Sequence, residues 1–443
     1  MPPGPAAVDA RLGAILALVR LHRLDAAAKA LDAIRRAPGA EAAVSIGQAA
    51  ISLASGSAQI AADALAPAPA GAALTQLGRG EVAAARGDHD AARRAFTAAS
   101  TAEPPVPWIR ANAFVYASRL TSDAGSALGL LDQAVAADPL FLHAWTDRAV
   151  LLADAGRVAD AQATLATAQA LAPDDELVVA LRAALDAPRP AVADVEAMAA
   201  AFTAGAKAKR LGTWEASKPA LATVLMRDTL GPLSPRGQGA AFLAGLFAAL
   251  DTNPRLRVAP RGITDALTTR LGLTPESLES PSTLQRLGAV LDTPALLLGG
   301  TYSVDGKAQL QLRLMSAIQA EAVTTLAEDL GDPARVTTAA RAAADRIATA
   351  VRVKFPLHGE VTALSGDLLV LTVTAAHGVR VGDGFRVVAD ARPITVGDRT
   401  VGYQQRLVGT VTVTEVGETS SRAKPTTGGP FEAGQHVVEI AEP

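Results

Sequence analysis

The residues that could carry catalytic or metal chemistry are few and widely spaced. The six histidines are His22, His89, His143, His358, His377 and His436. None stands three or four residues from another, the spacing that brings two metal ligands together on a helix. Cysteine is absent, which excludes disulfides, thiolate metal sites and cysteine nucleophiles. We therefore expect no metal site.

The motifs that hold phosphates or build nucleophiles are also missing. The chain has no Gly-x-x-x-x-Gly-Lys-Ser/Thr phosphate loop and no Gly-x-Ser-x-Gly elbow. Gly299-Gly300 follows a predicted strand, but the dinucleotide fingerprint does not continue from it. Asp383 and Asp398 stand in Gly-Asp turns, where an aspartate bonds its own backbone. We expect no enzymatic activity and no cofactor.

Composition limits the class of partner. The 443 residues are enough for about three domains at the usual size of roughly 100–200 residues each. Basic residues number 41 and acidic residues 44, so the formal charge is −3. This near balance excludes a globally basic nucleic-acid binder and leaves only a local basic patch for that role, and we expect no nucleic-acid partner. Aromatic residues are only 3% of a chain that is 49% hydrophobic, which favours cores of Ala, Leu and Val.

Small, large and proline positions repeat in the first half of the chain with a period of 34 residues. The matching sets are Ala127, Leu131, Ala134 and Pro139, then Ala161, Leu165, Ala168 and Pro173. This pattern resembles the tetratricopeptide repeat (TPR), an α-solenoid of helix pairs. Repeats are expected at 73–106, 108–141 and 142–175, with two degenerate helix pairs in 8–72 and a capping helix at 174–186. The TPR-like helical domain is predicted over 1–190.

The TPR resemblance implies that the first helix of each repeat lines a concave face. Positions 2, 5, 9 and 12 of such a helix share one side. The polar residues predicted to bind a protein segment there are Asn112, Tyr116, Arg119, His143 and Thr146. Two other interpretations stay open: these residues face solvent, or they contact another domain of this chain.

The middle of the chain predicts a linker helix and then an α/β sandwich. The linker covers 191–217, with a helix from Val192 to Leu211, and the α/β domain covers 218–355. Asp305-Gly306 is a two-residue hairpin signal. After it, Leu310, Leu312 and Leu314 alternate with polar residues, which indicates a strand with one buried face. A helix is expected from Asp332 to about Val353.

The α/β segment resembles a block shared by three bacterial families. The stretch LGAVLDTPALLLGGTYSVDGKAQLQLRLMSAIQAEAVTTLAEDL is similar to part of the TolB amino-terminal domain and of the CsgG-like and FlgO-like proteins. The resemblance covers 218–355 and rests on element order more than on residue identity. It departs from the family pattern at Asp292-Thr293-Pro294, where Gly-Ala-Asp is usual. It implies a domain of a cell-envelope machine.

The final segment, 356–443, predicts a small SH3-like β-barrel. Its short alternating runs are rich in Val and Thr and separated by Gly-Asp and Gly-Gly turns. The stretch from Gly378 to Val387 resembles the carboxy-terminal domain of the flagellar assembly protein T family. That resemblance again implies a cell-envelope context. A generic barrel without a specific partner is the alternative.

Together these patterns predict a non-enzymatic scaffold or assembly protein of a bacterial cell-envelope complex, of flagellar or secretion type. We expect protein partners in such an assembly, and homo-oligomerisation is left open. No run of about 18 apolar residues occurs, so no transmembrane helix is expected. The periplasm or cell envelope is the expected location, with a secretion signal outside the numbered chain. A cytoplasmic TPR adaptor is the alternative, and a pore-forming protein is a weaker third.

Overall fold

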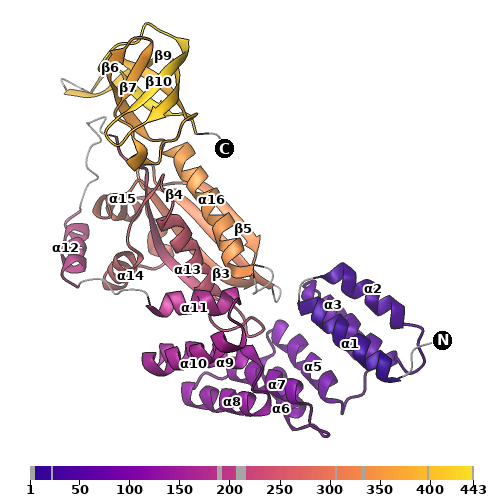
Figure 1. The fold of residues 1–443 in the computed structure, drawn as a ribbon. Helices are drawn as coiled ribbons and strands as arrows, with labels where there is room; N and C mark the ends of the chain where they lie inside the picture. Colours follow the sequence, from indigo (N-terminus) through magenta and orange to yellow (C-terminus); the bar gives the residue numbers. More distant parts are fainter. Residues whose placement is uncertain are drawn as a thin grey trace.

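Three structural parts follow one another along the molecule. The structure is a computed structural model that describes residues 5–20, 23–186, 192–205, 216–304, 307–330, 335–396 and 399–441. A helical array forms one end, a mixed sheet with its helices lies in the middle, and a β-barrel forms the other end (Figure 1). The predicted succession of a helical region and a sheet-rich carboxy-terminal part is confirmed.

The helical array consists of antiparallel helices joined by short turns. They are α1 (Pro5–Arg20), α2 (Leu24–Ile34), α3 (Glu41–Ala54), α4 (Ala58–Leu65), α5 (Ala73–Ala85), α6 (His89–Thr101), α7 (Pro107–Arg119), α8 (Ala124–Ala137), α9 (Leu142–Asp154), α10 (Val158–Leu171) and α11 (Glu176–Asp186). The repeated positions Ala127, Leu131 and Ala134 are at most 1% exposed. Small residues at these positions let neighbouring helices approach closely, and large ones fill the space between them.

A five-stranded sheet forms the middle of the molecule. The strands are β1 (Ala220–Thr229), β2 (Arg257–Val258), β3 (Ala295–Val304), β4 (Lys307–Ser316) and β5 (Glu321–Asp329), in the order β2-β1-β3-β4-β5. β1 is parallel to β2 and β3, whereas β4 is antiparallel to both β3 and β5. Leu310, Leu312 and Leu314 are at most 1% exposed, as their alternation predicted. The Asp305-Gly306 turn lies outside the described residues.

Helices pack on both faces of this sheet. α13 (Gln238–Asp251) and α16 (Val336–Lys354) cover one face, and the expected start of α16 at Asp332 lies outside the described residues. On the other face lie α14 (Arg261–Arg270), α15 (Pro281–Val290) and α12 (Val192–Thr203). The helix expected to be a linker therefore packs on α14 and α15 and ends at Thr203. Its predicted continuation toward Leu211 lies outside the described residues.

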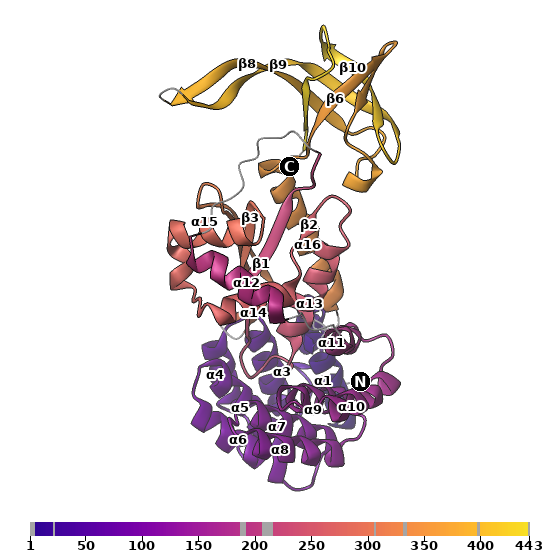
Figure 2. The same ribbon diagram turned by 90° about the vertical axis from the view of Figure 1, so that its left-hand side faces the viewer.

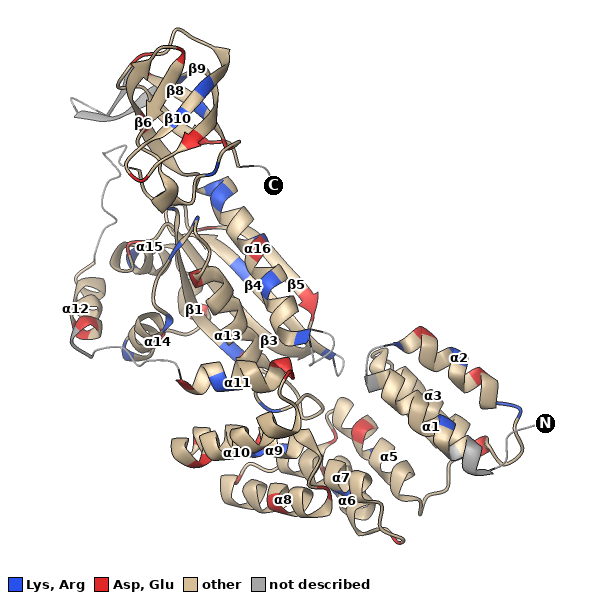
Figure 3. Ribbon diagram, viewed as in Figure 1, with Lys and Arg blue, Asp and Glu red and all other residues tan. Residues whose placement is uncertain are grey.

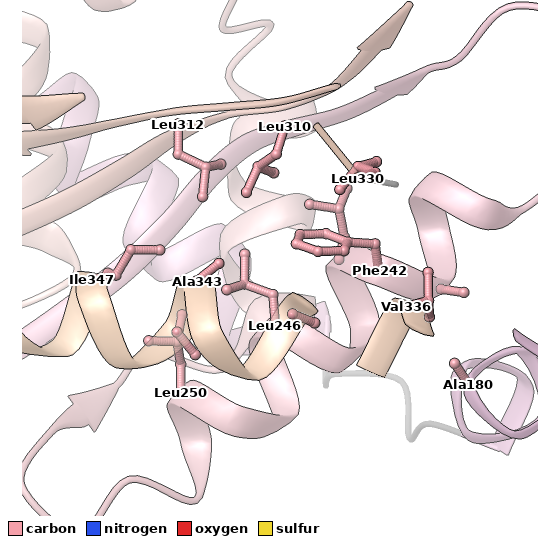
Figure 4. Packing of buried hydrophobic residues seen from close by; sticks show 14 of the residues in the cluster. Ala180, Phe242, Leu246, Leu250, Leu310, Leu312, Leu330, Val336, Ala343 and Ile347 are labelled. Atoms are coloured by element: carbon pink, nitrogen blue, oxygen red, sulfur yellow. The ribbon is translucent and has the colours of Figure 1, made fainter. Parts of the chain in front are cut away.

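The repeat domain and the sheet share one hydrophobic core. Leu177 and Leu181 of α11 belong to the same buried cluster as Phe242, Leu246 and Leu250 of α13. Figure 4 shows α13 side chains meeting those of α16 and the sheet, with α11 alongside. α11 was expected as the cap of the helical array. It also covers the edge of the α13–α16 layer, so the repeat domain is not an independent arm.

The carboxy-terminal strands close into a barrel, which confirms that prediction. They are β6 (His358–Ser365), β7 (Leu368–Leu371), β8 (Gly384–Val396), β9 (Arg399–Val416), β10 (Ser421–Gly428) and β11 (His436–Glu439). Their order around the barrel is β10-β7-β6-β11-β8-β9. Leu371, Phe385 and Val387 fill its interior at 0% exposure. The β8–β9 hairpin extends well beyond the barrel wall (Figure 2).

Ion pairs hold the barrel against the middle part. Arg255, before β2, donates to Asp383 at 2.8 Å and to Glu439 at 2.9 Å. Arg352, near the end of α16, also bonds Glu439, whose side chain is only 5% exposed. These arginines come from two elements of the middle part and meet one acidic cluster of the barrel. These ion pairs therefore restrain the barrel relative to the middle part, in addition to the chain connection between them.

Candidate protein-binding site

The first helices of the repeats line an apolar cavity of about 240 Å³ on the concave face of the helical array. α1, α3, α5 and α7 supply nearly all of its lining. The residues are Leu16, Val19, Ile46, Ala49, Ala50, Leu53, Ala54, Leu65, Leu74, Leu77, Gly78, Glu81, Val82, Trp108, Tyr116 and Leu233. Aliphatic side chains dominate this list, so the cavity suits an apolar side chain better than a charged or strongly polar ligand.

Aromatic residues form one wall of this cavity. Tyr116 stacks on Phe96 with ring centroids 5.2 Å apart. The guanidinium of Arg119 lies 5.4 Å from the centre of the Tyr116 ring, within the range of a cation–π contact. Phe96 is 1% exposed, so its packing holds the tyrosine ring in place. Tyr116 thus presents a fixed aromatic surface at the end of the cavity.

A loop of the middle part occupies the groove next to the cavity. Arg119 donates to the carbonyl oxygens of Pro232 and Leu233, both at 3.4 Å. Leu233 packs against the cluster of α5, α6 and α7 and also lines the apolar cavity. The backbone N–H of Arg236 donates to Asp147 at 3.0 Å, and its guanidinium donates to the Ser118 carbonyl at 3.1 Å. The concave face therefore already holds a peptide segment of its own chain.

A buried ion pair anchors this contact. Arg119 Nε donates to Asp147 Oδ2 at 2.6 Å, and the side chains are 5% and 0% exposed. Asp147 accepts from Arg119 and from the Arg236 backbone, so its charge is compensated where water is excluded. Burial lowers the pKa of the Arg236 guanidinium, Asp147 opposes that shift, and the nearby Arg119 charge adds to it.

The same loop lines a polar cavity of about 670 Å³. His89, Arg93, Asp154, Asp228 and Arg236 are among its lining residues. Burial raises the pKa of Asp154, the Arg236 charge opposes this rise, and the Asp228 charge adds to it. Asp228 also accepts from the backbone N–H at the start of α13, where the helix dipole favours a carboxylate. The charges here therefore position the loop between the two parts.

The five residues predicted to bind a protein segment do not line one cavity together. Asn112 is 4% exposed and donates to the Trp108 carbonyl, while Thr146 is 0% exposed and donates to the His143 carbonyl. Arg119 contacts the middle part, which is the alternative that the sequence left open. His143 lies edge-on to Phe141, with centroids 5.7 Å apart. Only Tyr116 of the predicted set lines the apolar cavity. Partner binding by the set stays a prediction.

The prediction missed the residues that make the groove apolar. Trp108 was not singled out, although its position one residue before Ile109 places it at the start of α7. The lining residues of α1 and α3, such as Leu16 and Leu53, were assigned only to degenerate repeats. Leu233 and Arg236 come from a loop distant in sequence, and no local pattern points from them to α7 or α9.

Two further features concern metal binding and membrane-spanning helices. Within the described residues, no group of three or more His, Cys, Asp or Glu side chains is placed to hold a metal ion. No helix in the described part of the chain is both long enough and apolar enough to cross a membrane.

Comparison with known families supports the repeat assignment. Residues 121–185 match the family model of the tetratricopeptide repeat. This match spans α8 to α10 and nearly all of α11, so it includes α9, which carries Asp147. Tetratricopeptide repeats indicate a protein–protein interaction module. No curated protein matches the chain in sequence.

Proposed function

We propose that the protein is a non-enzymatic scaffold or assembly protein of a bacterial cell-envelope complex, of flagellar or secretion type. Its repeat domain recruits a partner protein through the concave face. The observation that carries the binding role is the apolar cavity between α1, α3, α5 and α7. An apolar cavity on a concave repeat surface fits the side chain of a protein segment, because its burial there supplies the affinity.

The loop in the neighbouring groove supports this mode of binding. Arg119 bonds two successive carbonyl oxygens of that loop, and Leu233 enters the apolar wall. The groove therefore has the groups needed to hold an extended backbone and an aliphatic side chain. A partner segment that enters the cavity from α1 and α3 would contact Leu233 and extend the same interface. Among the described residues, the amino-terminal half of the groove carries the apolar cavity.

The envelope context rests on the two later parts. The resemblance of 218–355 to TolB-, CsgG- and FlgO-like domains rests mainly on its order of elements, and that of 356–443 to the flagellar assembly protein T family rests on the stretch from Gly378 to Val387. A braced pair of domains suits a component of a larger assembly, because it presents two fixed faces to its neighbours. The proposed location is the periplasm or the cell envelope. A cytoplasmic TPR adaptor is the second candidate.

The binding role is tested with charged substitutions in the cavity. Leu53→Glu and Leu74→Glu place a carboxylate among the aliphatic lining at half-buried positions, where folding tolerates the change better than in the core. Ile60→Glu, at a 57% exposed position of α4 outside the cavity, is the matched control. Partners are identified by cross-linking in the source cells, and each is then purified and titrated. We expect the cavity variants to bind at least about tenfold more weakly than Ile60→Glu.

The envelope assignment is tested separately. Source cells are fractionated, and the protein is followed by immunoblotting alongside cytoplasmic and periplasmic markers. Protection from protease in intact cells and exposure after outer-membrane permeabilisation are the expected results. Recovery with the cytoplasmic marker, protected until the inner membrane is lysed, would favour the adaptor instead.

A further inference from the structure

The last strand of the middle sheet leaves one backbone edge open. Among the described residues, β5 pairs only with β4, and it stands at the end of the strand order. It is nine residues long, longer than a typical protective edge strand. The N–H and C=O groups on its outer edge therefore form a template to which another strand can add.

The middle of β5 lacks the charges and prolines that usually protect an edge, although its register with β4 is irregular between Ala322 and Thr324. The run from Ala322 to Ala327 contains no charge and no proline, and it includes the β-branched residues Val323, Thr324 and Thr325. Most of its side chains are exposed, although Val323 and Leu326 pack partly on the core. An exposed, neutral, β-prone edge promotes aggregation unless another chain covers it.

The face of the sheet beside this edge is only partly covered, because Leu278 and Leu284 pack over its inner strands. A cavity of about 740 Å³ lies there, lined by Ala322, Thr325 and Ala327 of β5 and extending inward to Leu298 and Met315. The opposite face is covered by α16, whose Lys354 bonds Glu321 at 2.9 Å. An added strand would therefore find its backbone partners along β5 and room for its side chains over the uncovered part of the sheet.

The charges of β5 select the added strand. Acidic residues stand at both ends, with Glu321 at one and Glu328 and Asp329 at the other. Glu321 and Glu328 also pair with Lys354 and Arg346 of α16, and Glu321 keeps a side chain that is 55% exposed. Figure 3 shows the acidic colour at the arrowhead of β5. If two copies paired antiparallel about Thr325, Glu321 would face Asp329 at both ends, and parallel pairing in register would set each acid against itself. Like charges directly opposite each other destabilise a pair of strands.

We propose that β5 binds an extended strand of a partner protein by β-augmentation, and that this strand has a neutral β-prone centre flanked by Lys or Arg. The strand would complete the ladder left open by β5, and its basic ends would lie opposite the acidic ends of β5. This site is separate from the concave face of the repeats, so it provides the scaffold with a second protein contact.

Two synthetic peptides test the proposal on the full-length protein. Both have the centre Val-Thr-Val-Thr-Val. One peptide carries two lysines at each end, and the other carries two glutamates at each end. Fluorescence anisotropy of labelled peptides measures the affinities at low and moderate salt. We expect the lysine peptide to bind at least about tenfold more tightly, with the difference shrinking as salt rises. No binding of the lysine peptide, or equal binding of both, would overturn the proposal.

Variants of β5 then locate the contact. The double variant Glu321→Lys, Glu328→Lys should reverse the preference between the peptides, whereas Glu415→Lys in the barrel should leave it unchanged.

Successive residues of a strand direct their N–H groups alternately to the two sides. One of Thr324→Pro and Thr325→Pro should therefore keep the β4 ladder, monitored by circular dichroism, yet lose peptide binding. If the charge variant keeps the preference for the lysine peptide, the peptide binds elsewhere. If the unliganded protein sediments as a dimer and the charge variant alters that dimer, β5 serves self-association instead.

Discussion

Asp147 is the residue on which the contact between the repeat domain and the middle loop depends. It is fully buried, pairs with Arg119 and accepts from the backbone of Arg236. We predict that Asp147→Ala lowers the free energy of unfolding by about 3–5 kcal/mol, because it leaves a guanidinium buried without a counter-charge. Urea unfolding followed by circular dichroism measures the loss.

The exposed pair of Arg148 and Asp132 provides the control for that measurement. Asp132 is 61% exposed in this pair. Asp132→Ala should therefore cost less than about 1 kcal/mol, since exposed ion pairs contribute little. Equal losses in the two variants would show that the buried pair has no special role.

His358 makes the stability of the barrel depend on pH. Burial lowers its pKa below the ordinary 6.5, and the charge of His436 acts in the same direction. Below pH 6.5 the unfolded chain binds a proton that the folded barrel resists, so stability should fall as pH drops through the lowered folded pKa. We predict that His358→Gln reduces this loss between pH 7.5 and pH 5.

The surroundings of His358 define the controls. His436 faces Asp390, with its Nε2 3.7 Å from the carboxylate. His89 has an exposed side chain on the helical array. His89→Gln should leave the acid-induced loss of stability unchanged. If His358→Gln also leaves it unchanged, another group carries the acid sensitivity.

Two glycines of the repeat helices should respond to replacement by alanine with opposite changes in stability. A Cβ on Gly80 of α5 would lie 2.4 Å from the Phe96 ring, which is 1% exposed and cannot move away. A Cβ on Gly129 of α8 would meet nothing within 4 Å. We predict that Gly80→Ala destabilises by about 1–3 kcal/mol, whereas Gly129→Ala stabilises by up to about 1 kcal/mol through helix propensity. Thermal and urea unfolding measure both changes in stability. If the two changes have the same sign, the packing argument is wrong.

The order of the three parts gives the molecule an elongated shape with a braced barrel (Figures 1 and 2). Arg255 and Arg352 provide the bracing through Asp383 and Glu439. We predict that the double variant Arg255→Ala, Arg352→Ala frees the barrel and increases the radius of gyration in small-angle scattering. The full-length protein is needed, because removing 1–190 would uncover the α13 surface that α11 buries.

Arg422→Ala is the control for the scattering experiment. Arg422 pairs with Glu415 within the barrel, with both side chains more than half exposed. Its removal should leave the scattering profile unchanged. A wild-type profile that already requires a freely moving barrel would contradict the braced arrangement.

Local pattern alone was enough to predict the helical repeats, the alternating strand β4 and a carboxy-terminal barrel. The reason is that helix and strand periodicity and the spacing of small residues act over short sequence distances. Of the residues predicted for the inner face, Tyr116 lines the cavity. The type of each inner residue, however, did not reveal whether it faces solvent or the rest of the chain.

Only the tertiary structure decided what occupies the concave face. Arg119 and Asn112 look like binding residues in the sequence, yet one is held by Asp147 and a distant loop and the other by Trp108. The loop from Gly231 to Gly237 lies more than a hundred residues after α7, and the α12 helix packs on α14 and α15 rather than linking two parts. Burial and charge pairing across such distances depend on how whole elements dock, and no local pattern carries that information.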